Sequence, residues 1–122
     1  MKKQKYGNKI IVVDGMKFHS VREYERWIYL CHLAQGGVIS ELRRQVEFDL
    51  IPAQYEEPII GSRGGMRKGK CIERAVKYIA DFVYLDENGG TVVEDSKGYH
   101  TKDYIIKKKL MLWLHGIRIK EV

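Results

Sequence analysis

The chain has 122 residues, of which 44% are hydrophobic, 31% are charged and only two are proline. This composition excludes a disordered or collagen-like protein, and the length corresponds to about one domain. Lys and Arg number 22 against 16 Asp and Glu, and the net charge of +6 favours a polyanion, usually nucleic acid, as a partner. No apolar stretch approaches the ~18 residues that span a bilayer, and the basic N-terminus lacks the apolar core of a signal peptide. We therefore expect a single cytoplasmic domain over residues 1–122 and no membrane partner.

The hydrophobic pattern predicts a mixed α/β domain around one central sheet. In chain order it predicts a β-hairpin over residues 9–18, a helix over 21–35, strands over 43–51, 75–85 and 91–97, a helix over 103–115 and a strand over 117–122. Ser20 is a typical N-cap residue for the first helix, and Gly116 lies where a glycine commonly ends the second. Pro52 ends the first long strand, because proline cannot donate to a central β-ladder.

Residues 53–70 show no long periodic pattern and indicate a flexible basic loop, into which short strands can extend. Its cations are Arg63, Arg67, Lys68 and Lys70. These side chains can follow a nucleic-acid backbone, or they can be incidental charges of a solvated loop. Residues 64–71 match a phosphate-binding P-loop except at Cys71, which stands where Ser or Thr must contact magnesium. We therefore expect no nucleotide cofactor.

Two apolar segments in the second half of the chain each carry a carboxylate in mid-run, at Asp81 and Asp95. Burial of a lone carboxylate costs several kcal/mol unless a partner compensates it. Two neighbouring buried carboxylates repel each other, and a divalent cation relieves that repulsion. Magnesium prefers hard oxygen ligands and keeps water molecules for chemistry. Asp81 and Asp95 therefore predict a Mg²⁺ site, with Mn²⁺ as a substitute ion.

The turn between these segments decides whether Asp81 and Asp95 share a face of the sheet. A two-residue loop at Asn88-Gly89 would place Asp81 on the face away from Asp95. A three-residue loop that includes Gly90 would place Asp81 diagonal to Asp95. The second glycine favours the odd loop, so the metal-site hypothesis predicts a turn of odd length or a bulge.

An acid in one strand, followed by Asp95-x-Lys97 in the next, resembles the PD-(D/E)XK nuclease superfamily, with its restriction-endonuclease-like fold and αβββαβ core. The segments that carry the resemblance are Phe18-His-Ser-Val-Arg-Glu23, Tyr78-Ile-Ala-Asp81-Phe82 and Val92-Val-Glu-Asp95-Ser-Lys97-Gly98. In detail the chain is similar to the small phage-encoded nucleases of this superfamily, some of them related to Holliday junction resolvases. The name-giving motif is altered at two positions, because Ala80 replaces its proline and Asp95 stands where Glu is common.

The resemblance implies a catalytic role for each residue of this group. Asp81 and Asp95 would hold one or two Mg²⁺ ions, joined by the Ser96 carbonyl and by Glu23, the acid that the family places on its first helix. The ion would activate a bound water and neutralise the charge of the phosphate in the transition state. Lys97 would orient or deprotonate the attacking water, or pair with the phosphate.

Several of these residues also have a purely structural interpretation. Glu23 lies within the apolar arc of its helix and can approach the sheet, but Ser20-x-x-Glu23 is also a capping box, which alone would explain the glutamate. Lys97 can instead form a cross-strand ion pair. Glu94, on the other side of its strand from the catalytic acids, is expected to be a solvated or supporting acid. Gln45 is a further candidate for positioning water or phosphate.

The second helix combines lysines with apolar residues. Ile106, Leu110 and Trp113 are spaced to pack on the sheet, which would leave lysines free for DNA phosphates. The DNA contacts expected near this helix are Lys102, Tyr104, Lys107 and Lys108. Each of them can instead belong to a solvated helix face.

The resemblance implies a magnesium-dependent DNA endonuclease that cuts branched or structured DNA in recombination, in the host cytoplasm if the chain is phage-encoded. We expect a homodimer, because symmetric nicking of a junction needs two sites. Two rival hypotheses are a non-catalytic nucleic-acid-binding protein with this fold, and a basic structural or assembly protein whose acids pair with its lysines.

Overall fold

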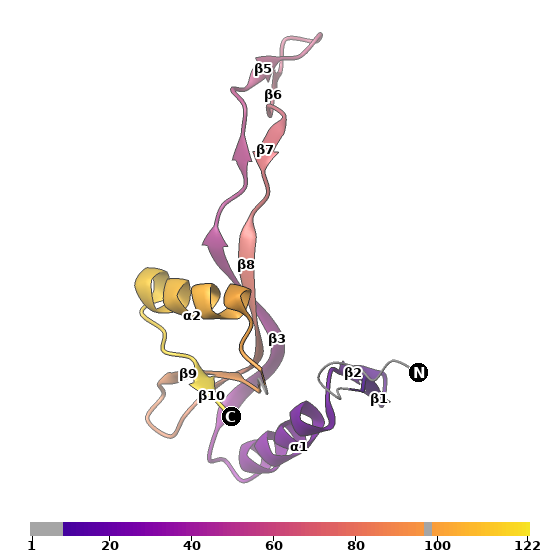
Figure 1. Ribbon diagram of the computed structural model, residues 1–122, viewed down its shortest axis with the longest axis vertical. Helices are drawn as coiled ribbons and strands as arrows, with labels where there is room; N and C mark the ends of the chain where they lie inside the picture. Colours follow the sequence, from indigo (N-terminus) through magenta and orange to yellow (C-terminus); the bar gives the residue numbers. More distant parts are fainter. Residues whose placement is uncertain (1–8, 97–98) are drawn as a thin grey trace.

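The computed structural model describes residues 9–96 and 99–122 (Figure 1). In chain order its elements are β1 (Ile11–Val13), β2 (Met16–Phe18), α1 (Val21–Gln35), β3 (Ser40–Ile51), β4 (Gln54–Tyr55), β5 (Ile59–Ile60), β6 (Met66–Arg67), β7 (Cys71–Glu73), β8 (Val76–Leu85), β9 (Thr91–Asp95), α2 (Lys102–His115) and β10 (Lys120–Glu121). These elements confirm the predicted mixed α/β class. The structure lengthens the first predicted long strand, which begins at Ser40, and shortens the last strand to two residues. No helix among the described residues is long and apolar enough to cross a membrane.

A four-stranded sheet of order β10-β9-β8-β3 forms the centre of the domain. β3, β8 and β9 pair antiparallel, whereas β10 runs parallel to β9. Val92 packs with the cluster that contains Leu30 of α1, and Val93 packs with the cluster that contains Met111 of α2. Because successive residues of a strand point to opposite faces, the two helices cover opposite faces. The sheet therefore lies between two hydrophobic cores.

Helix α1 begins and ends at the predicted residues. The Oγ atom of Ser20 accepts the N–H of Glu23 at 3.1 Å, as expected of an N-cap. Further along the helix, Leu30 is fully buried, and the ring of Trp27 stacks on Phe82 of β8 with 6.1 Å between the centroids. These contacts hold α1 against the sheet at its start and along its middle.

Beyond the end of β3 the chain leaves the sheet as a long two-stranded arm, residues 52–75, which projects from the body of the domain (Figure 1). β4 pairs with β7, and nearer the tip β5 pairs with β6. The N–H of Glu56 donates to the carbonyl of Lys70 at 2.8 Å, and any side chain at Gly69 would collide with the backbone of Glu56. The short strands expected within the basic loop are therefore present, and they carry its cations away from the sheet.

The side of α2 that faces the sheet differs from the prediction. Tyr104 and Met111 are buried against the sheet, and Leu110 packs partly against the same core. Ile106 and Trp113, which the spacing predicted to pack there, are instead 57% and 84% exposed. Apolar side chains occur on all sides of α2, so the sequence pattern alone did not determine which side would be covered.

Candidate functional site

Asp81 of β8 and Asp95 of β9 lie on neighbouring strands. Residues 86–90 connect these strands, so the turn has five residues, odd in length as predicted but longer than the expected three. The antiparallel register ends at the pair Phe82 and Glu94. One further step along both strands brings Asp81 directly opposite Asp95, whereas the three-residue loop predicted a diagonal position; in both arrangements the two acids are neighbours.

Hydrogen bonds hold both carboxylates in place. The backbone N–H of Ser96 donates to Oδ2 of Asp81 at 2.8 Å, and the hydroxyl of Tyr78 donates to Oδ2 of Asp95 at 2.6 Å. Asp95 is only 1% exposed, whereas Asp81 is half-buried. Burial raises the pKa of Tyr78, the hydrogen bond to Asp95 raises it further, and the negative charge of Asp81 adds to the shift. The two acids therefore contribute to one region of negative potential.

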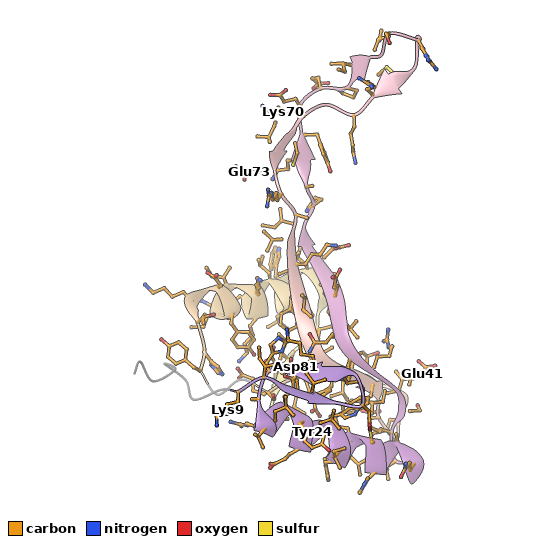
Figure 2. The ribbon with its side chains drawn as sticks, turned by 90° about the vertical axis from the view of Figure 1, so that its right-hand side faces the viewer. Lys9, Tyr24, Glu41, Lys70, Glu73 and Asp81 are labelled. Carbon is orange, nitrogen blue, oxygen red and sulfur yellow. The ribbon has the colours of Figure 1, made fainter. Side chains whose placement is uncertain are left out.

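Glu23 reaches this region from α1. Figure 2 shows the strand of Asp81 over α1, where Tyr24 is labelled. The Glu23 side chain is almost fully buried, and its Oε2 accepts the N–H of His19 at 2.8 Å while its Oε1 accepts from Nε2 of Gln45 at 3.1 Å. The same Nε2 atom lies 3.5 Å from Oδ1 of Asp81. Glu23 thus stabilises the start of its helix and is linked to Asp81 through Gln45. The acid site consists of Glu23, Gln45, Asp81 and Asp95.

Replacement of Ser20 by Ala tests the contribution of the helix cap. The substitution leaves the N–H of Glu23 without its side-chain acceptor, so we expect the free energy of unfolding to fall by about 1 kcal/mol. Urea denaturation followed by circular dichroism measures the change. Ser62→Ala, in the exposed part of the arm, is the matched control and is expected to leave the stability unchanged. Equal stabilities of the two variants would show that this cap does not stabilise α1.

At Gln45, the inward-facing side chains of β3 switch from the α1 side of the sheet to the α2 side. Arg44 packs over aromatic rings on the α1 side, whereas Val46, two residues further, packs in the core under α2. On β8, Ala80 packs in the core under α2, whereas Phe82 packs in the core under α1, and Asp81 lies between them. Because both strands change faces together, their register continues unchanged across this point. Gln45 has a backbone φ of 52°, which is uncommon outside glycine. The sequence around Gln45 did not indicate this conformation.

Glu94 was predicted to be a solvated or supporting acid, but the structure buries it completely and pairs it with the partly exposed Arg26. Its carboxylate is 0% exposed and accepts from Nε and an Nη atom of Arg26 at 2.8 and 2.7 Å. The hydroxyl of Tyr84 donates to the same carboxylate. The hydrogen bond to Glu94 raises the pKa of Arg26, although burial acts in the opposite direction. This pair joins α1 to β9 and so fixes the helix of Glu23 against the strand of Asp95.

The donors of the acid site suit a hard divalent cation. Mg²⁺ prefers carboxylate oxygens, and it commonly takes one or two of them and completes its shell with water. The Oγ atom of Ser96, close to the Asp81 carboxylate, is buried and has no hydrogen-bond partner among the described residues, so it could accept or donate to a metal-bound water. Across residues 9–96 and 99–122, no three His, Cys, Asp or Glu side chains gather closely enough to hold an ion by themselves. Lys97 lies outside the described residues.

The predicted DNA contacts fall into two groups. Those on the arm are all exposed, namely Arg63, Arg67, Lys68 and Lys70, the last of which is labelled in Figure 2. On α2, Lys102 is exposed and Lys107 is half-buried. The prediction for Tyr104 is wrong, because this side chain is buried and its hydroxyl donates to Glu121 at 2.9 Å. Lys108 also binds Glu121, with 2.7 Å between Nζ and Oε1, and so helps to hold α2 against β10.

Comparison with known proteins finds a matching family model. The family model described as "Protein of unknown function (DUF1064)" matches residues 3–118. No curated protein matches the chain, and no solved structure matches it.

Proposed function

The chain belongs to the DUF1064 family, and from its acid site we propose that it is a magnesium-dependent endonuclease that hydrolyses phosphodiester bonds in branched or structured DNA. The observation that carries the proposal is that Asp81 stands next to Asp95 on the neighbouring strand and is linked through Gln45 to Glu23 of α1. Buried acids with a structural role are normally paired with cations, as Glu94 is here. Glu23 has Arg44 at 3.9 Å from its Oε1 atom. The half-buried Asp81 is held by neutral donors among the described residues, which is an arrangement that suits a carboxylate that binds a metal ion.

Each residue of the acid site has a role that its contacts support. Asp81 and Asp95 would hold Mg²⁺ together with water and the Ser96 carbonyl. Gln45 would place Glu23 and a water or phosphate oxygen relative to Asp81, because its amide already lies next to both carboxylates. When bound, the ion lowers the pKa of a coordinated water and stabilises the charge on the phosphate. Lys97 keeps the role that the sequence predicts, as the cation that orients the attacking water or binds the phosphate.

The position of the arm supports a nucleic-acid substrate that is either extended or branched. Figure 2 shows Lys70 on the projecting arm and Asp81 in the body of the domain, well separated along the molecule. The arm cations can neutralise backbone phosphates without reading sequence. A nucleic acid that contacts both the arm and the acid site must therefore extend along the domain or branch between the two places.

Incubation of the full chain with labelled duplex, flap and four-way-junction DNA tests the proposal. We expect cleavage of the flap or the junction in the presence of Mg²⁺ or Mn²⁺, and none with EDTA. Binding without cleavage under all metal conditions would overturn the proposal and favour a non-catalytic nucleic-acid-binding protein. Absence of both binding and cleavage would favour a basic structural or assembly protein.

A further inference from the structure

The outer end of the arm combines positive charge with exposed aliphatic side chains. This tip segment, residues 58–70, contains four cations and no acid, whereas the three acids of the arm lie outside it. Ile60 and Met66 are 74% and 70% exposed, and neither hydrophobic core contains a residue of the arm. The tip segment is therefore complementary in charge to a polyanion, and it also offers that partner an apolar contact.

Strand pairing places the two aliphatic side chains next to each other. Ile60 and Met66 are the last cross-strand pair of β5 and β6 before the turn, so their side chains point to the same face of the hairpin. The turn is closed by the N–H of Gly61, which donates to the carbonyl of Gly65 at 2.6 Å. Three of its five residues are glycine and add no side-chain bulk. The hairpin thus ends in a narrow apolar wedge.

Arginines lie beside this wedge. A hollow of about 450 Å³ at the tip is lined by Arg63, Met66 and Arg67, together with Gly61, Ser62 and Gly65 of the turn. Guanidinium groups bind phosphate oxygens and also enter narrow minor grooves, where the negative potential is strongest. A nucleic acid that the two arginines hold is therefore also within reach of the wedge.

Contacts between its two halves brace the arm behind the tip. The Nζ atom of Lys68 lies 4.2 Å from the centroid of the Tyr55 ring, on the other half of the arm. The backbone bond from Glu56 to Lys70 lies in the same stretch. A hairpin that is ordered before it binds loses less conformational entropy on binding. Figure 1 shows β5 and β6 at the far end of the arm, away from both helices.

We propose that the tip segment enters the minor groove of duplex DNA and inserts Ile60 and Met66 against a base step, which unstacks that step and bends the duplex. Proteins that bend DNA in this way insert apolar side chains such as Ile and Met and use Arg and Lys in the groove. The tip segment has both, and it contains no Asn, Gln, Asp or Glu to read base edges in the major groove. The inference rests on the proposed function only for its nucleic-acid partner and does not require cleavage.

An anionic membrane is the other surface that attracts cations and aliphatic side chains together. Segments that bind at a membrane interface are typically rich in Trp, Tyr or Phe. The tip segment contains none of these residues. Its composition therefore favours the groove of a duplex.

Energy transfer between dyes at the two ends of an A·T-rich duplex of about 30 base pairs tests the proposal. The full chain is added in EDTA, so that binding and bending are measured without cleavage. We expect the unmodified chain to raise the energy transfer, and netropsin, which occupies the minor groove, to compete with it. The double variant Ile60→Ser/Met66→Ser is expected to bind about tenfold more weakly and to leave the saturated duplex unbent.

The matched control is Ile72→Ser, because Ile72 is an exposed aliphatic residue of the same arm that lies outside the tip segment. It is expected to bind and bend the duplex as the unmodified chain does. All the substituted residues are largely exposed, so circular dichroism is expected to be the same for every variant.

Several results would overturn the proposal. They are absence of duplex binding, binding without a rise in energy transfer, binding that netropsin does not weaken, and full bending by the double variant. Binding to phosphatidylserine vesicles but not to the duplex would assign the tip segment to a membrane instead. Bending in EDTA without cleavage in Mg²⁺ would support this inference and contradict the proposed nuclease, whereas cleavage without bending would contradict this inference alone.

Discussion

Asp81→Asn is expected to lower the rate of magnesium-dependent DNA cleavage by about 10³-fold or more, because the ion would lose several kcal/mol of its contribution to the transition state. The substitution keeps the size of the side chain and an oxygen that can accept the N–H of Ser96. We therefore expect the fold and the affinity for DNA to be preserved. Single-turnover cleavage and a DNA-binding titration in EDTA measure the two properties separately.

The control for this variant is Glu87→Gln, which removes an exposed carboxylate from the turn after the same strand. It changes the net charge of the chain by the same amount, so any general electrostatic effect on DNA binding will appear in both variants. Cleavage by Asp81→Asn at the rate of the unmodified protein would contradict the assignment of Asp81 as a metal ligand. Loss of DNA binding together with cleavage would instead assign Asp81 a part in holding the nucleic acid.

Arg26→Met is expected to lower the free energy of unfolding by about 3 kcal/mol, the largest stability change predicted for this chain. The substitution removes the bidentate partner of the buried Glu94 carboxylate and leaves it only the more distant ion pair with Lys120, whose Nζ atom lies at 4.0 Å. Urea denaturation measures the change. Arg22→Met is the matched control, because Arg22 is an exposed arginine one turn earlier in the helix that donates only to the exposed carbonyl of Val122, and its effect is expected to be within about 0.5 kcal/mol.

A second substitution distinguishes the effect of a weakly paired buried charge from that of a general packing defect. Glu94→Gln in the Arg26→Met background removes the buried charge, while the amide oxygen can still accept from Tyr84. We expect the double variant to be more stable than Arg26→Met alone. If it is equally or less stable, the loss in the single variant comes from packing of the Arg26 side chain and not from the weakly paired carboxylate of Glu94.

Local signals predicted the elements and much of the acid site. Ser20 and Gly116 marked the ends of helices because a side-chain acceptor and a left-handed residue satisfy backbone groups within a few positions along the chain. The odd length of the turn after β8 was also predicted from two glycines. Its exact length was not, since Asp86 accepts the N–H groups of both Asn88 and Gly90 and so closes a longer loop.

The features that the sequence did not reveal depend on contacts between distant segments. Arg26 and Glu94 are 68 positions apart, and nothing near either residue indicates the other. The unusual φ of Gln45 occurs where the side chains of β3 change from one hydrophobic core to the other. This change of face depends on both helices packing on the assembled sheet and has no local sequence signal. The packing side of α2 was missed for a different reason, because a helix that is apolar all round carries no periodic signal.

Surface turns are ordinarily the parts of a protein in which evolution tolerates insertions and deletions most readily. The connection between Leu85 and Thr91 matters to the acid site through the pairing that it allows, because a slip of one residue in the pairing of β8 with β9 would turn Asp81 away from Asp95. A turn of another length is therefore expected to preserve the proposed reaction only where it keeps Asp81 opposite Asp95, even though no residue of the turn itself contacts the ion or the substrate in that reaction.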